Sequence, residues 1–247
     1  MRTDVRCPSP GNGMYGPMCG SETFLAALQF GDSLFPSGAF AQSSGLETLV
    51  ADGEVAGAAD LRALLRAHLV HRLARADLPV LLAVHAAAAG GDLDTVLEAD
   101  RLLAAVKLGR EERTASARTG RRIAAEAARL APAPVLDAFA QAAAAGRCPG
   151  NAAAAQGIAT QAMGIPAEPA ALLACYTFGA ALVAAALRLM RIGHGEAQAV
   201  LRDSRPDMAA AAEIARRADW RDPRPCLPRV DVAGARHERA AARLFAS

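Results

Sequence analysis

The stretch LQFGDSLFPSGAFAQSSGLE, residues 28–47, separates a glycine- and proline-spotted leader from a long succession of helical segments. Its apolar start ends at a Gly-Asp pair, and a turn follows in which Phe35 and Phe40 flank the sequence PSGA. Pro36 has a fixed φ and no backbone N–H, so it interrupts a helix, and Gly38 can adopt the positive φ of a tight turn. Only 4% of the chain is aromatic, so we expect this turn either to pack on the protein's own core or to bind a partner.

The composition favours helices and a reducing compartment. Hydrophobic residues make up 53% of the 247 residues, mostly Ala and Leu, which are strong helix formers. The net charge of +2 does not indicate a dedicated nucleic-acid binder. The five cysteines form no CxxC pair, so they indicate neither a disulfide framework nor a zinc site. We therefore expect a cytoplasmic protein.

Two segments require a check for targeting or membrane insertion. Residues 1–20 lack the apolar region of a secretory signal and are predicted to form a disordered leader. Residues 170–187 are uncharged over 18 positions, which is the lower limit for a membrane span. Much of this run is alanine, which contributes little to insertion. We expect a buried central helix over residues 170–190 and no membrane span.

The remaining pattern is that of helices joined by short Gly- and Pro-containing links. No segment alternates polar and apolar residues over the length of a strand. Ser21, Asp92 and Asn151 are the expected N-caps. The sequence predicts helices over residues 22–30, 42–51, 61–73, 78–89, 93–106, 110–130, 134–145, 152–163, 169–190, 196–201, 205–219 and 232–245.

These helices predict an all-α, single-domain, multi-helix bundle packed around the one central apolar helix. The bundle is expected to span residues 21–222. A proline-rich linker and a C-terminal partner-binding tail follow over residues 223–247.

His68 and His71 are the metal-ligand candidates. Their spacing of three residues can place two ligands on one helix face, but no third ligand is close in sequence, and Leu69 and Leu73 place the core beside them. An ordinary helix surface is the competing interpretation. The chain also lacks a GxxxxGK[ST] loop, so it is not expected to bind a nucleotide through one.

Residues 110–130 form the most charged predicted helix, with Glu and Arg interleaved. Such a pattern is typical of a solvated face. The functional interpretation is a rim that contacts another protein.

Four motifs resemble the UreF family of urease accessory proteins. The first joins a Ser-x-Leu-Pro-x-Gly-Ala-aromatic turn to Ser-x-Gly-Leu-Glu, matched here by Ser33, Pro36, Gly38, Ala39, Phe40, Ser43, Gly45, Leu46 and Glu47. Phe35 replaces the family's leucine, and the aromatic that usually follows Phe40 is missing. Residues 112–122 resemble the second motif of the family, and residues 191–198 resemble the third, with His194 where the family usually has Gln. The fourth is similar to residues 228–247. Only the leader lies outside the match.

The resemblance implies a protein that carries out no chemistry of its own. Members form homodimers, bind the UreD/UreH scaffold and recruit the UreG GTPase for nickel delivery to apo-urease. Nickel would be handled by the assembly and GTP by the partner, so no cofactor is expected here. A helical metal-binding enzyme using His68 and His71 is the alternative, and an Arg-rich nucleic-acid binder is a further competing class. The expected partner-binding residues are Phe35, Pro36, Gly38, Phe40, Glu47, Arg229, Asp231, Arg236, His237, Glu238, Arg243, Leu244 and Phe245.

The tail itself, residues 229–247, has few apolar side chains for its length. The linker Pro223–Pro228 removes backbone donors and separates the tail from the bundle. We therefore expect a segment that is mobile alone and ordered on binding. The alternative is a tail that packs on its own core.

Overall fold

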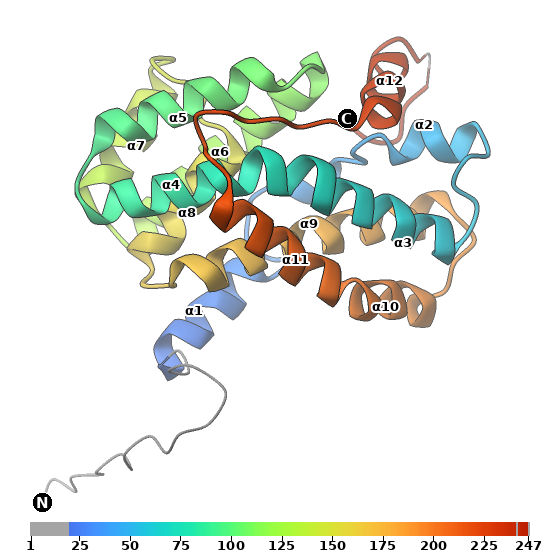
Figure 1. Ribbon diagram of the computed structural model, residues 1–247, viewed down its shortest axis with the longest axis horizontal. Coiled ribbons are helices and arrows are strands. Elements are labelled where there is room, and N and C mark those ends of the chain that lie inside the picture. The colour runs from blue at the N-terminus through green and yellow to red at the C-terminus, as the bar shows by residue number, and fades with distance from the viewer. Residues whose placement is uncertain (1–19, 241, 247) are drawn as a thin grey trace, which may run out of the picture.

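The computed structural model describes residues 20–240 and 242–246, without the side chain of Phe40, and all regular structure in this part of the chain is helical (Figure 1). The predicted leader lies outside the described residues except for Gly20. The elements are α1 (Ser21–Gly31), η1 (Ala39–Ala41), α2 (Leu46–Ala51), α3 (Ala58–Ala67), η2 (His68–Arg72), η3 (Leu73–Arg75), α4 (Asp77–Ala89), α5 (Leu93–Val106), α6 (Arg110–Leu130), α7 (Pro134–Ala144), α8 (Ala152–Ala162), α9 (Ala167–Leu189), α10 (His194–Asp203), α11 (Arg205–Arg217) and α12 (Pro228–His237).

Most predicted helix boundaries agree with the structure to within a few residues, and the all-α fold is confirmed. Asp92 is the N-cap of α5, where its side chain accepts a hydrogen bond from Thr95 N at 3.0 Å. Ser21 is the first residue of α1, and Gly20 occupies the N-cap position instead. The predicted helix over 61–73 is interrupted, because α3 widens into the π-helix η2 before ending in η3.

The tightest packing lies where α8 contacts both α4 and α6. Glycines permit this approach: a Cβ on Gly157 would lie 2.5 Å from the carbonyl oxygen of Leu81, and one on Gly120 would overlap the backbone of Gly150 and Asn151. Small side chains thus bring these helices into backbone contact.

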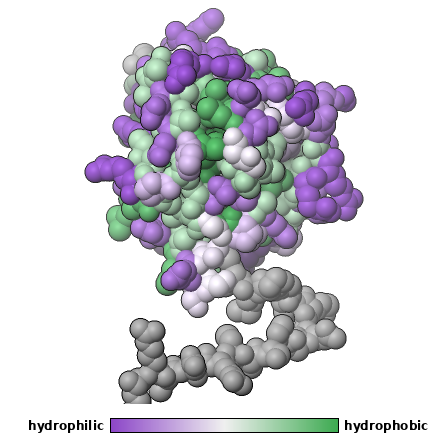
Figure 2. Space-filling model, turned by 90° about the vertical axis from the view of Figure 1, so that its left-hand side faces the viewer, coloured by the Kyte–Doolittle hydropathy of each residue, from purple (hydrophilic) through white to green (hydrophobic). Residues whose placement is uncertain are grey.

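Seen from the side that carries α5 and α7, apolar residues show at the centre of the face between polar side chains (Figure 2).

Helix α9 is the predicted central helix. It packs against α1, α2, α3, α4, α8, α10 and α11. It is also the one helix among the described residues that is long and apolar enough to cross a bilayer, and 56% of its apolar window is buried within the protein. Burial by surrounding helices is typical of the core helix of a globular domain.

The end of the chain is docked on the bundle rather than free. The linker after α11 crosses the face of the bundle (Figure 1) and donates from Arg224 N to Arg75 O and from Cys226 N to His71 O, both at 3.0 Å. Helix α12 then packs on α2 and α6. It spans Pro228–His237, not the predicted 232–245. The expectation of an undocked tail was therefore wrong for this chain alone, and the alternative of packing on its own core describes the structure.

Candidate functional site

The turn over residues 32–38 is anchored to the protein's own core. Phe35 is buried and its ring lies 4.8 Å from that of Phe30. Gly38 has φ +73°, as predicted, and the guanidinium of Arg122 occupies the space that a side chain would need. By contrast, Leu34 is 89% exposed. The exposed apolar side chain of this turn is thus Leu34, which the sequence motif did not single out.

Glu47, in the first turn of α2, is the point to which the end of the chain is tied. Its carboxylate accepts hydrogen bonds from Leu244 N at 2.7 Å, from Phe245 N at 3.1 Å and from the His237 ring at 3.1 Å. Burial opposes ionisation of this carboxyl, but these donors outweigh burial and lower the pKa of Glu47 below its usual value. A charged Glu47 therefore holds the C-terminal backbone in place.

His237, at the end of α12, is only 2% exposed and lies between two carboxylates. Its Nε2 faces Glu47, and its Nδ1 is 2.7 Å from Oε2 of Glu111. Both ring nitrogens are within hydrogen-bond distance of a carboxylate oxygen, so His237 joins α12 to both α2 and α6.

The same contact continues along the segment. Glu111 also pairs with Arg243, and its backbone N–H donates to Glu238 at 3.1 Å. The C-terminal segment therefore supplies a hydrogen-bond acceptor for the first turn of α6, whose N-cap residue, Gly109, offers no side chain. We call Glu47, Glu111, His237, Glu238, Arg243, Leu244 and Phe245 the C-terminal docking cluster.

Phe245 provides the apolar anchor of this cluster. It is buried, and the guanidinium of Arg188 lies 5.8 Å from its ring centre. Two exposed ion pairs join α12 to the residues that follow α2. Arg229 pairs with Glu54 at 2.5 Å, and Arg236 pairs with Asp52 at 2.5 and 3.0 Å. Exposed pairs of this kind contribute little stability, so the buried contacts of Glu47, His237 and Phe245 carry the docking.

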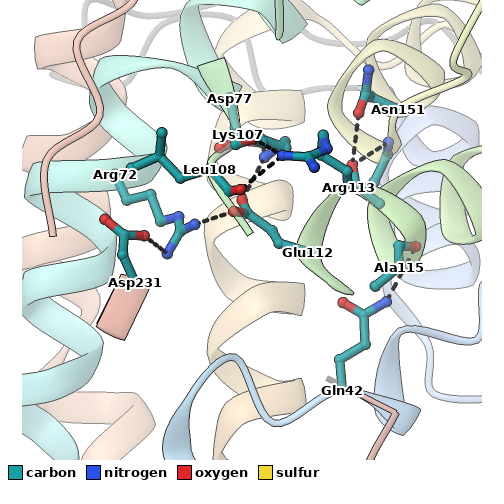
Figure 3. A network of polar contacts seen from close by, with 12 residues as sticks. Gln42, Arg72, Asp77, Lys107, Leu108, Glu112, Arg113, Ala115, Asn151 and Asp231 are labelled. Atoms are coloured by element: carbon teal, nitrogen blue, oxygen red, sulfur yellow. Dashed lines mark hydrogen bonds and ion pairs between the residues drawn. The ribbon is translucent and has the colours of Figure 1, made fainter. Parts of the chain in front are cut away.

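A second network lies beneath α12 (Figure 3). Arg72 lies between Glu112 and Asp231, and Lys107 lies 2.7 Å from Asp77 and 3.1 Å from Glu112. Burial opposes the charge of Lys107, but Asp77 and Glu112 outweigh it and raise its pKa. This network connects η2, α4, α6 and α12. Sequence reasoning identified only Asp231, because the other members are distributed over residues 72–112.

The predicted partner-binding residues thus divide into two groups. Most of those in the C-terminal segment contact Glu47 of α2, the two acidic residues that follow α2 or the first turn of α6, whereas Asp231 pairs with Arg72 of η2. Phe35 and Gly38 instead contact Phe30 and Arg122, and Pro36 is exposed. The side chain of Phe40 lies outside the described part of the structure. One link joins the two groups, because Ala246 N donates to Ala41 O at 3.0 Å.

The two histidines of the metal alternative are in different environments. His68 is buried in the core, contrary to the surface position considered from the sequence, and His71 is exposed. Within residues 20–240 and 242–246, no three His, Cys, Asp or Glu side chains are grouped so as to hold a metal ion. His194 is exposed at the first turn of α10.

Comparison with known proteins agrees with the motifs. A profile described as UreF matches residues 55–205. The chain is 29% identical over 223 residues to the urease accessory protein UreF of Yersinia pseudotuberculosis serotype IB (strain PB1/+). The aligned residues cover 90% of this chain and 97% of that protein. The proteins of the same name from Yersinia pestis (strain Pestoides F) and Yersinia enterocolitica serotype O:8 show the same identity and coverage. Because the profile covers more than half of the residues, the chain belongs to the UreF family of urease accessory proteins.

Proposed function

We propose that this protein is a non-catalytic adaptor in urease maturation. It binds the UreD/UreH scaffold as a cytoplasmic homodimer and recruits the UreG GTPase, and the assembly inserts nickel into apo-urease. Nickel is handled by that assembly and GTP is bound by UreG. Membership of the UreF family supports this role.

The observation that carries the proposal is the docked C-terminal segment. Hydrogen bonds to the Glu47 carboxylate fix its backbone, while Val232 and Leu244 remain 59% and 62% exposed. Arg239, between them in sequence, is exposed as well. Exposed apolar side chains on an ordered backbone, accompanied by arginine, are typical of protein-binding surfaces. We assign UreD/UreH binding to this surface.

Co-purification with UreD and UreG tests the assignment. The variant Val232→Glu/Leu244→Glu changes only exposed side chains, so its helical circular dichroism should match that of the parent. We expect it to bind UreD at least about tenfold more weakly, because charges would be placed in an apolar interface. Leu130→Glu, at the exposed end of α6, is the matched control and should bind normally.

The order of assembly gives a second readout. UreG should be retained by the UreD complex of the parent protein and lost with the double variant, together with urease activation. A folded double variant that still captures UreD and supports activation would place the scaffold-binding surface elsewhere.

A further inference from the structure

A cavity of about 200 Å³ lies among η2, α4, α6, α8 and α9, with α12 on one side. Most of its wall is apolar. The aliphatic and aromatic side chains that line it include Leu78, Leu81, Ala174, Phe178, Ala181 and Val230. The space is partly open to solvent and much larger than the water-sized voids usual in protein interiors, so it is large enough to admit a small molecule.

The cavity is also lined by polar side chains, among them Gln42, Thr119, Gln156 and His68, and the most deeply buried of these four is His68. Its side chain lines the space and is fully buried, and neither Nδ1 nor Nε2 makes a hydrogen bond of standard geometry, although the backbone of Ser44 lies close to the ring. Its ring packs against Phe178, with the ring centres 5.1 Å apart. Buried polar atoms are almost always paired in folded proteins. An unpaired imidazole facing a cavity therefore indicates a position where a bound molecule would complete the hydrogen bonding.

The local backbone is consistent with a binding role. His68 is the first residue of the π-helix η2, in which the turn of the preceding helix α3 widens. Short π-helical insertions occur frequently at functional sites. His68 lies in the interior, whereas His71, three residues later, is at the surface.

The charges around the cavity exclude several ligand classes. Burial, with a smaller contribution from Arg72, lowers the pKa of His68 to about 3, although the nearby carboxylate of Glu112 and the backbone of Ser44 oppose the shift. The ring is therefore neutral near pH 7 and offers one donor and one acceptor. The cations at the wall, Arg72 and Lys107, are already paired with carboxylates. No free positive charge is left there for an anion, and within the described residues no group of three metal-ligating side chains is present.

We propose that this cavity binds a small, uncharged aromatic molecule that carries one hydroxyl or N–H group, with His68 as its hydrogen-bond partner. The size fits one ring with a substituent, because an apolar cavity of about 150 Å³ is sufficient to bind benzene. The aromatic body would lie against Phe178 and the leucines of α4, and its polar group would face the imidazole.

Phenol and toluene are the probes for this proposal, because they have nearly the same shape and differ in the hydroxyl group. The full chain is labelled with ¹⁵N-histidine, and the ring resonances of His68 are followed during titration up to about 10 mM. We expect a saturable shift with phenol and at least about fivefold weaker binding of toluene, which cannot hydrogen-bond to the ring. Equal affinities would overturn the proposed hydrogen bond to His68, and no shift with either compound would overturn the proposal and leave a cavity that holds only water.

Two variants separate recognition from the cavity itself. His68→Leu should weaken phenol binding at least about fivefold without weakening toluene binding. Ligand-detected saturation transfer measures both affinities. His71→Leu, three residues away at the surface, is the matched control and should bind phenol normally. Unchanged phenol affinity in folded His68→Leu would overturn the assignment of His68. If that variant does not fold, Ala181→Leu fills the cavity while keeping the imidazole, and a persistent His68 shift in that variant would overturn the cavity as the site.

Discussion

In the α4–α8–α6 layers, helices meet through glycine and alanine, whereas the C-terminal segment meets α2 and α6 through carboxylates that accept hydrogen bonds. The first kind of contact depends on shape and does not change with pH. The second depends on the charge of Glu47 and Glu111. The difference suggests a rigid core that carries a segment whose docking can be adjusted by charge and by a competing partner.

The largest effect is expected on the core side of this comparison. Gly157→Val should destabilise the fold by about 3 kcal/mol or more, because the added carbons would overlap the Leu81 carbonyl between two packed helices. Chemical denaturation measures the loss. Gly195→Ala, whose Cβ would enter open space, is the control and should not destabilise. A normal transition midpoint for Gly157→Val would contradict the backbone contact between α4 and α8.

The buried imidazole should make the core sensitive to acid. The unfolded chain takes up a proton at His68 below about pH 6.5, but burial lowers the pKa of His68 in the folded state to about 3. The free energy of unfolding therefore falls as the pH decreases between these values, by at most about 1.4 kcal/mol per pH unit.

Urea denaturation of the parent and of His68→Leu at pH 7 and pH 5 measures this contribution. The parent should lose up to about 2 kcal/mol more than the variant between these pH values. Equal losses in the two proteins would mean that His68 is accessible to protons in the folded state.

An effect smaller than that of Gly157→Val is expected at the turn. Gly38→Val places a β-branched residue at φ +73° and against the Arg122 guanidinium, which should cost about 1–3 kcal/mol. Thermal unfolding with urease activation as a second readout tests this. A variant that melts and activates urease like its parent would show that the turn has no need of glycine.

The sequence predicted most of the helices because Gly, Pro and Asp mark where they begin and end. Asp92 is a clear case. The burial of His68 also had a signal, since it continues the apolar spacing of Leu61, Leu64 and Leu65. That signal was outweighed because the His68–His71 pair was interpreted as part of an ordinary helix surface, with a metal site as the alternative.

The docking of the C-terminal segment could not be predicted in the same way. Its apolar residues are too few to predict stable packing on the bundle. Besides the buried Phe245, however, hydrogen bonds to Glu47 and Glu111 hold it there. The bonds from His237 span 190 and 126 positions in the sequence, respectively. Propensity and periodicity describe neighbours along the chain, so they contain no information on contacts at that distance.

The proposed function requires that Glu47 ties the C-terminal segment into the surface that UreD/UreH binds. Glu47→Gln removes the charge but keeps the size, and Glu54→Gln, which removes the exposed pair with Arg229, is the matched control. Amide hydrogen exchange over residues 237–246 and capture of UreD are measured on the same samples. We predict faster exchange and weaker capture for Glu47→Gln alone, with an unchanged helical signal. Faster exchange with undiminished capture of UreD would contradict the account.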